Sequence, residues 1–94
     1  MSSLLSVNRS DHYLSDLQSV YDYIGQDNPD AAMGMLLLID DQVDGLRDPN
    51  FPRRIGRKAG TLELVAHPNY VVVIMQTTTA VTALAIMHVA RPYP

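Results

Sequence analysis

The sequence predicts an α+β domain with the element order β-α-α-β-β-β, in which a mainly antiparallel sheet carries an α-helical hairpin on one face. Two observations lead to this prediction. Apolar residues recur at helical spacing over two adjacent stretches in the first half, and three runs rich in β-branched residues follow one another closely in the second half. A chain of 94 residues accommodates one hydrophobic core, so we expect a single domain over residues 1–94.

The first half begins with a short apolar segment at residues 4–8, which predicts the first strand. Ser10 is a typical helix N-cap and the following Asp11 suits the positive end of a helix. Gly25 ends this helix. Spacings of three, four and three residues predict that its buried face consists of Leu14, Leu17, Tyr21 and Ile24.

A second helix begins directly afterwards, with Asn28 as the N-cap and Pro29 at the first helical position. A link this short makes the two helices antiparallel neighbours. The predicted inner face of the second helix consists of Ala32, Met35, Leu36, Ile39, Val43 and Leu46.

Residues 49–60 contain two prolines and two glycines, which predicts a loop. Three strand-like runs follow at residues 61–66, 70–76 and 80–89, and Val, Ile and Thr dominate them. The connections "HPN" and "TTT" are short enough for hairpins, so we expect these three strands to be antiparallel neighbours.

The predicted sheet is unusually apolar. In residues 70–75 both alternating sets of side chains are apolar, and the second helix is apolar nearly all round between Met33 and Ile39. One helix pair covers only one sheet face, and large exposed apolar patches are rare in monomers. We expect another chain to bury part of this surface; the alternative is a central strand buried on both faces within the chain.

The charge is distributed unevenly along the chain, whose formal net charge is −3. Residues 1–48 hold nine Asp against two Arg, whereas residues 49–94 hold five basic residues against Glu63 alone. The basic residues predict one positive surface that binds an acidic partner; the alternative is two solvated faces that differ in charge. This surface would consist of Arg53, Arg54, Arg57, Lys58 and Arg91.

Several classes of protein are not indicated. Without Cys there is no disulfide or thiolate metal site, and His12, His67 and His88 lack the spacing of a zinc site, so we expect no metal and no cofactor. The apolar runs are too short for a membrane helix, and no signal-peptide pattern opens the sequence. We therefore expect a cytoplasmic protein.

Several motifs together resemble the RelE/ParE superfamily of bacterial toxins, and the ParE branch in particular. The motifs are "YLSDLQSVYDYIGQDNPDAA" (13–32), "RRIGRKAG" (53–60), "TLELVAHPNYVVVI" (61–74) and "VARPYP" (89–94). Their order is preserved over nearly the whole chain. The resemblance implies the toxin of a type II toxin–antitoxin system, neutralised by a cognate antitoxin that covers apolar surface.

Within this superfamily, ParE-like members resemble inhibitors of DNA gyrase without established catalytic chemistry, whereas RelE-like members cut mRNA on the ribosome. A nuclease needs a base, an acid and cations near the phosphate, for which Glu63, His88 and Arg91 are the candidates. The run from 61 to 89 contains no Lys or Arg, which favours the gyrase inhibitor. Tyr93 joins the basic residues as a target-binding candidate. A ribosome-dependent endoribonuclease stays the alternative, and an inactive member that only binds antitoxin is a third.

Overall fold

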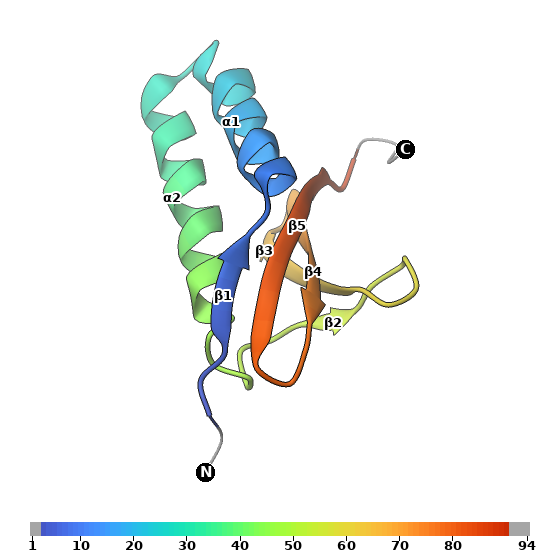
Figure 1. Cartoon of the computed structure of the whole chain (residues 1–94). Helices are drawn as coiled ribbons and strands as arrows, with labels where there is room; N and C mark the ends of the chain where they lie inside the picture. The colour runs from blue at the N-terminus through green and yellow to red at the C-terminus, as the bar shows by residue number, and fades with distance from the viewer. Residues whose placement is uncertain (1–2, 91–94) are drawn as a thin grey trace.

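The computed structural model describes residues 3–90 and contains two helices and five strands. In chain order the elements are β1 (Ser6–Arg9), α1 (Asp11–Gly25), α2 (Pro29–Gly45), β2 (Arg54–Ile55), β3 (Leu62–His67), β4 (Tyr70–Gln76) and β5 (Ala80–His88). The helices lie side by side on one face of the sheet, and the loop after β2 projects from the opposite face (Figure 1). The predicted α+β class and the helical hairpin on one face are confirmed.

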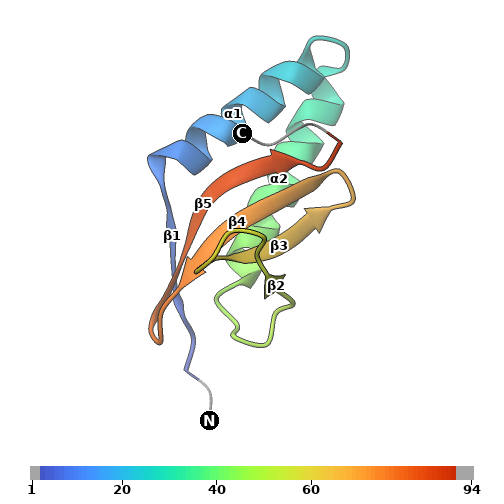
Figure 2. The same ribbon diagram turned by 90° about the vertical axis from the view of Figure 1, so that its right-hand side faces the viewer.

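The five strands form one sheet in the order β1-β5-β4-β3-β2. β1 runs parallel to β5, and the three other pairings are antiparallel. Figure 2 shows β5, β4 and β3 as successive neighbours, joined by tight turns at alternate ends. The two predicted hairpins are therefore confirmed.

Both predicted helix caps are present. The side chain of Ser10 accepts a hydrogen bond from the backbone N–H of Tyr13 at 3.0 Å, and that of Asn28 accepts one from Ala31 at 3.1 Å. Each bond satisfies an N–H group that has no partner within its own helix. Pro29 stands at the first turn of α2, where its missing N–H costs nothing.

Of the predicted buried face of α1, Leu17 is buried and Tyr21 and Ile24 are half-buried, whereas the prediction is wrong at Leu14. Leu14 is exposed, whereas the preceding Tyr13 is fully buried. The Tyr13 hydroxyl donates a hydrogen bond to Asp40 Oδ1 at 3.0 Å, so its polar atom is satisfied in the core. Burial and the adjacent Asp40 carboxylate raise the pKa of Tyr13, which keeps the phenol a donor. The spacing of apolar residues along α1 cannot predict this burial, because the hydrogen-bond acceptor of Tyr13 is Asp40 on α2.

The main core lies between the helix pair and the sheet. The inner face predicted for α2 packs there, including the buried Ile39, Val43 and Leu46. From the sheet it receives the buried residues Leu64, Ala66, Tyr70, Val72, Ile74, Val81 and Ala83.

A second, smaller core forms on the other face of the sheet and consists of Val71, Val73, Ala85 and Met87. Residues 70–74 of β4 are therefore buried on both faces within the chain. For this strand, burial on both faces within the chain is therefore the interpretation that applies. Large apolar side chains are exposed elsewhere, for example at Met33 and Leu37 on α2 and at Val65 on β3.

β2 lies in the segment predicted as loop, so that prediction is wrong at two residues. Arg54 pairs with Glu63 and Ile55 pairs with Leu62. Two residues are too few for an alternating pattern to show in the sequence. Their conformation follows from pairing with β3, which is a tertiary contact.

β5 contains an irregularity where β1 ends. The register with β4 shifts so that Val73 faces Ala85 and Ile74 faces Ala83, which leaves Leu84 as the extra residue. Beyond the end of β1, side chains at the beginning of α1 form hydrogen bonds with backbone groups of β5 that β1 does not reach. Ser10 Oγ donates to the Leu84 carbonyl at 3.0 Å, and the Ile86 N–H donates to Asp16 Oδ2 at 2.9 Å.

No helix within residues 3–90 has the length and apolar character of a membrane span.

Candidate functional site

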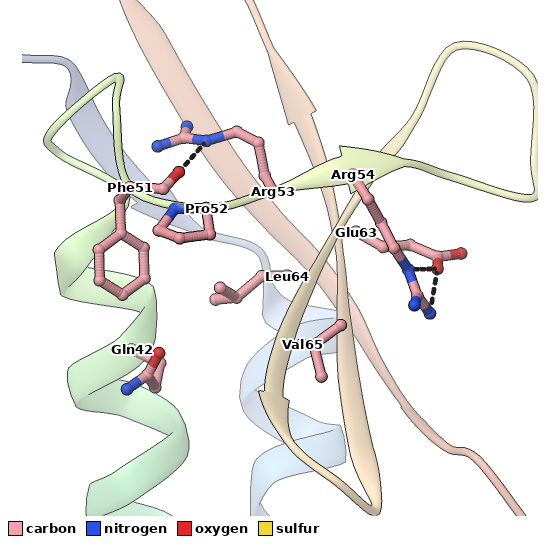
Figure 3. Close-up of a pocket in the computed structure, with 8 residues that line it drawn as sticks. All are labelled: Gln42, Phe51, Pro52, Arg53, Arg54, Glu63, Leu64 and Val65. Carbon is pink, nitrogen blue, oxygen red and sulfur yellow. Dashed lines mark hydrogen bonds and ion pairs between the residues drawn. The ribbon is translucent and has the colours of Figure 1, made fainter.

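The basic loop is organised around one buried carboxylate. Glu63 on β3 is only 3% exposed and receives both neighbouring guanidinium groups. Arg54 Nε donates to Oε1 at 3.1 Å (Figure 3), while Arg57 donates to Oε2 through Nε at 3.2 Å and through its backbone N–H at 3.1 Å. Glu63, the candidate base of the nuclease hypothesis, is therefore engaged in two ion pairs.

The environment of Glu63 keeps it ionised. Burial by itself raises the pKa of a carboxyl group, but the Arg57 N–H and the Arg54 guanidinium outweigh it and hold the pKa of Glu63 below its usual value. Both carboxylate oxygens already accept hydrogen bonds from charged or backbone donors. A carboxylate stabilised in this way is a weak proton acceptor.

The turn that carries Arg57 and Lys58 is closed by its own hydrogen bonds. The Gly56 N–H donates to the Thr61 carbonyl at 2.9 Å, and Thr61 Oγ1 donates to the Lys58 carbonyl at 2.7 Å. A side chain at position 56 would press against Thr61, which explains the glycine there. The loop therefore holds its cations on a defined turn.

Arg53 takes a different direction from the cations that follow it. Its guanidinium donates to the Gln76 side chain at 2.7 Å and to the carbonyls of Asp48 and Phe51 at 2.6 and 2.9 Å. Burial lowers the pKa of Arg53. Figure 3 shows this side chain near Phe51, whereas Arg54 extends toward Glu63. Arg53 thus fastens the segment after α2 to the end of β4.

The predicted positive surface is only partly assembled. Arg54 and Arg57 come together around Glu63, and the exposed Lys58 follows on the same loop. Arg53 is engaged in internal contacts. Arg91 and Tyr93 lie outside the described residues.

His88 lies on the face of the sheet that carries the helices, beside the aromatic ring of Tyr70. The two rings meet edge to face with centroids 5.1 Å apart, and His88 Nδ1 accepts the N–H of Ala90 at 3.1 Å. Asp16, Ser19, Val20 and Ile86 complete a small cavity of about 140 Å³ around this pair. The packing is typical of a structural edge histidine.

The structure does not bring Glu63 and His88 together. Glu63 pairs with Val73 and His88 pairs with Tyr70, and these two residues of β4 belong to the cores on opposite faces of the sheet. Since side chains alternate along a strand, Glu63 and His88 face opposite sides. Arg91, the third member of the nuclease hypothesis, lies outside the described residues.

Sequence reasoning missed a groove beside the outer edge of β3, with a volume of about 450 Å³. The residues that line it, shown in Figure 3, are Gln42, Phe51, Pro52, Arg53, Arg54, Glu63, Leu64 and Val65. Gly45 is the one sequence signal, because a Cβ there would lie 2.8 Å from the ring of Phe51. The glycine allows this ring to pack against α2 and form one wall.

Between residues 3 and 90, no three His, Asp or Glu side chains gather closely enough to hold a metal ion.

Comparison with known proteins agrees with this fold. Residues 7–93 match the family described as the ParE toxin of the type II toxin–antitoxin system parDE. The chain is 38% identical over 79 residues to Toxin RelE2 of Caulobacter vibrioides, which covers 83% of this chain and 88% of that protein. A solved structure described as the chromosomal ParDE TA system from P. aeruginosa is similar in fold, with a TM-score of 0.81 and 18% identity, covering 90% of this chain and 96% of that one.

Proposed function

Because this chain belongs to the ParE toxin family of type II toxin–antitoxin systems, we propose that it inhibits DNA gyrase by binding and that a cognate antitoxin neutralises it. Toxins of this system type are held inactive by a partner protein, so an antitoxin is implied by the family. Membership of the family does not by itself identify the target. The geometry of the described residues supports DNA gyrase as that target. The place of action is the cytoplasm, where gyrase and its DNA substrate meet.

The observation that carries the proposal is the separation of the two candidate catalytic groups. RNA cleavage requires a base and an acid on the two sides of one phosphate. Glu63 is buried and paired with two arginines, and His88 lies on the opposite face of the sheet. This arrangement supports inhibition through binding over acid–base catalysis.

The exposed cations supply a second line of support. Arg54, Arg57 and Lys58 are exposed. The loop that follows β2 projects from the sheet face opposite the acidic helices (Figure 1). Such charges act mainly on the rate and orientation of encounter with an acidic partner, and salt screens their effect. We include Arg91 and Tyr93 in the target-binding surface on the strength of the family motif.

Two assays run side by side test the proposal. Purified chain is added to a gyrase supercoiling reaction, and in parallel to a translation reaction whose mRNA is mapped by primer extension. We expect loss of supercoiling with intact mRNA, reversed when the antitoxin encoded beside the gene is added. Cleavage within codons with normal supercoiling would establish the ribosome-dependent endoribonuclease instead. Inactivity in both reactions would indicate a member kept only for antitoxin binding.

A further inference from the structure

The hairpin formed by β2 and β3 at residues 54–63 carries the most exposed large apolar side chain of the described chain. Ile55 is 87% exposed, more than any other large hydrophobic residue within 3–90. Single exposed apolar residues are common on protein surfaces, so the surroundings of Ile55 decide whether it is a contact residue. Here the surroundings are a projecting, rigid and charged hairpin.

The β2–β3 hairpin projects from the rest of the chain. β2 pairs with β3 over two residues only. The chain then continues outward beyond the sheet before it returns to begin β3 at Leu62 (Figure 1). A projection of this kind enters a cleft of a partner, which a flat surface does not do.

Internal hydrogen bonds hold the hairpin in one conformation. The Thr61 N–H donates to the Lys58 carbonyl at 3.1 Å, and the Arg57 N–H donates to the Glu63 carboxylate at the same distance. Gly60 has a φ of +81°, a left-handed conformation that glycine adopts without strain. A segment that is ordered before binding loses little conformational entropy on association, so its contacts contribute more to affinity.

The charge of the hairpin is opposite to that of the rest of the chain. Residues 54–63 hold Arg54, Arg57 and Lys58 against Glu63 alone, a net charge of +2, whereas the remaining residues carry −5, which together give the −3 of the whole chain. The carboxylate is 3% exposed and both guanidinium side chains are more than half exposed, so the charge presented to solvent is positive. An acidic partner attracts the hairpin and repels the rest, which orients the chain with the hairpin foremost.

The apolar and the charged side chains lie on two sides of the hairpin. Arg54 extends toward Glu63 (Figure 3). Since successive side chains of a strand point to opposite sides, Ile55 points away from that carboxylate. A cleft that receives the hairpin contacts both sides at once. Apolar anchors that fill a pocket, surrounded by a rim that excludes water, supply most of the affinity of protein interfaces.

We propose that the β2–β3 hairpin enters an acidic cleft on DNA gyrase, in which Ile55 fills an apolar pocket and carboxylates bind Arg57 and Lys58. This inference rests on the proposed function, because it names the surface by which the chain holds its target. Duplex DNA alone is the less suitable partner, since phosphates offer no pocket for Ile55 and a polyanion repels the acidic remainder of the chain. An acidic protein surface accommodates both the apolar and the cationic side chains.

Binding of the full chain to purified gyrase without DNA tests the proposal. Ile55→Thr keeps the β-branched shape but removes apolar surface, and we expect it to weaken gyrase binding about tenfold or more, as for an anchor residue. Ile55→Val should bind within about fourfold of the unmodified chain, the effect of one methylene group. The matched control is Leu14→Gln, an exposed apolar position on α1, which should leave gyrase binding unchanged. Thermal unfolding verifies that each variant is folded.

The outcomes separate this inference from the proposed function. Equal gyrase affinity of folded Ile55→Thr and the unmodified chain would overturn the hairpin as the contact while leaving gyrase as the target. The same titration with a labelled DNA duplex should show no binding that depends on Ile55. A duplex affinity that Ile55→Thr weakens, or gyrase binding only in the presence of DNA, would overturn the protein cleft. If the unmodified chain neither binds gyrase nor inhibits supercoiling, the proposed function itself fails.

Discussion

The backbone N–H of Arg57 lies 3.1 Å from the carboxylate of Glu63, so the basic loop closes onto β3 through a buried charge. The side chains of Arg54 and Arg57 bind the same carboxylate from the solvent side. The basic residues Arg54 and Arg57, which are close in the sequence, thus surround the carboxylate of Glu63 in the structure. The carboxylate fixes where the positive charge is presented.

Replacing Glu63 with Gln should destabilise the fold by about 1–3 kcal/mol, since hydrogen bonds to a charged group are lost and two arginines are left without their anion. Urea unfolding at neutral pH measures this loss. The matched control is Asp41→Asn on the exposed side of α2, which should change stability little. A Glu63→Gln variant as stable as the unmodified chain would contradict a structural role for the carboxylate.

The same carboxylate should make stability depend on pH. The pKa of Glu63 is lower in the folded chain than in the unfolded chain, so its stabilisation is fully present above the unfolded value of about 4.3. It is lost as the pH falls through the folded pKa. The free energy of unfolding should fall less between neutral and acidic pH for Glu63→Gln than for the unmodified chain. An equal fall in both proteins would count against this assignment.

Arg53 should behave as a structural residue and not as a binding residue. Arg53→Leu removes bonds to the Gln76 side chain and to the Phe51 and Asp48 carbonyls, with an expected loss of about 1–3 kcal/mol in unfolding free energy. Thermal unfolding gives the readout. Lys58→Gln is the control, because Lys58 is exposed and makes no side-chain ion pair within residues 3–90. Equal melting temperatures for the two variants would refute the distinction.

Lys58 should matter for encounter with the antitoxin. Lys58→Glu is expected to slow association about threefold to tenfold at low salt and much less at high salt, because exposed charges act through screened steering. The dissociation rate should stay the same. Stopped-flow association at several salt concentrations is the measurement, and a slowdown that persists at high salt would point to a direct contact.

Replacing His88 tests whether this residue acts as a catalytic acid or only as a structural residue. His88→Ala removes an edge-to-face contact with Tyr70, which should cost about 0.5–1.5 kcal/mol of stability beyond the loss of buried area. Growth inhibition at a temperature where the variant is folded should be retained. If the folded variant is fully inactive, the structural role assigned to His88 is insufficient.

The fold was largely predictable because its signals are local. Ser10 and Asn28 cap the helices as expected, and the β-branched runs form hairpins. The errors arise where tertiary contacts decide. Tyr13 is buried in place of Leu14 because Asp40 on α2 receives its hydroxyl.

The site was less predictable because like charges in sequence take different partners in space. Arg53 and Arg54 are adjacent, yet one binds Gln76 and the other binds Glu63. The groove at Val65 depends on where β2 stops and on how Phe51 packs against Gly45. Neither relationship produces a periodic pattern that a single sequence reveals.

The most direct test of the whole account is a titration of purified chain into gyrase and supercoiled plasmid, followed by quantification of cleaved, protein-linked DNA. We predict that cleaved DNA accumulates with increasing chain, reaches saturation, and disappears when antitoxin is added in equal amount. Unchanged supercoiling and no cleaved DNA at saturating concentrations of an active, growth-inhibiting preparation would contradict gyrase as the target.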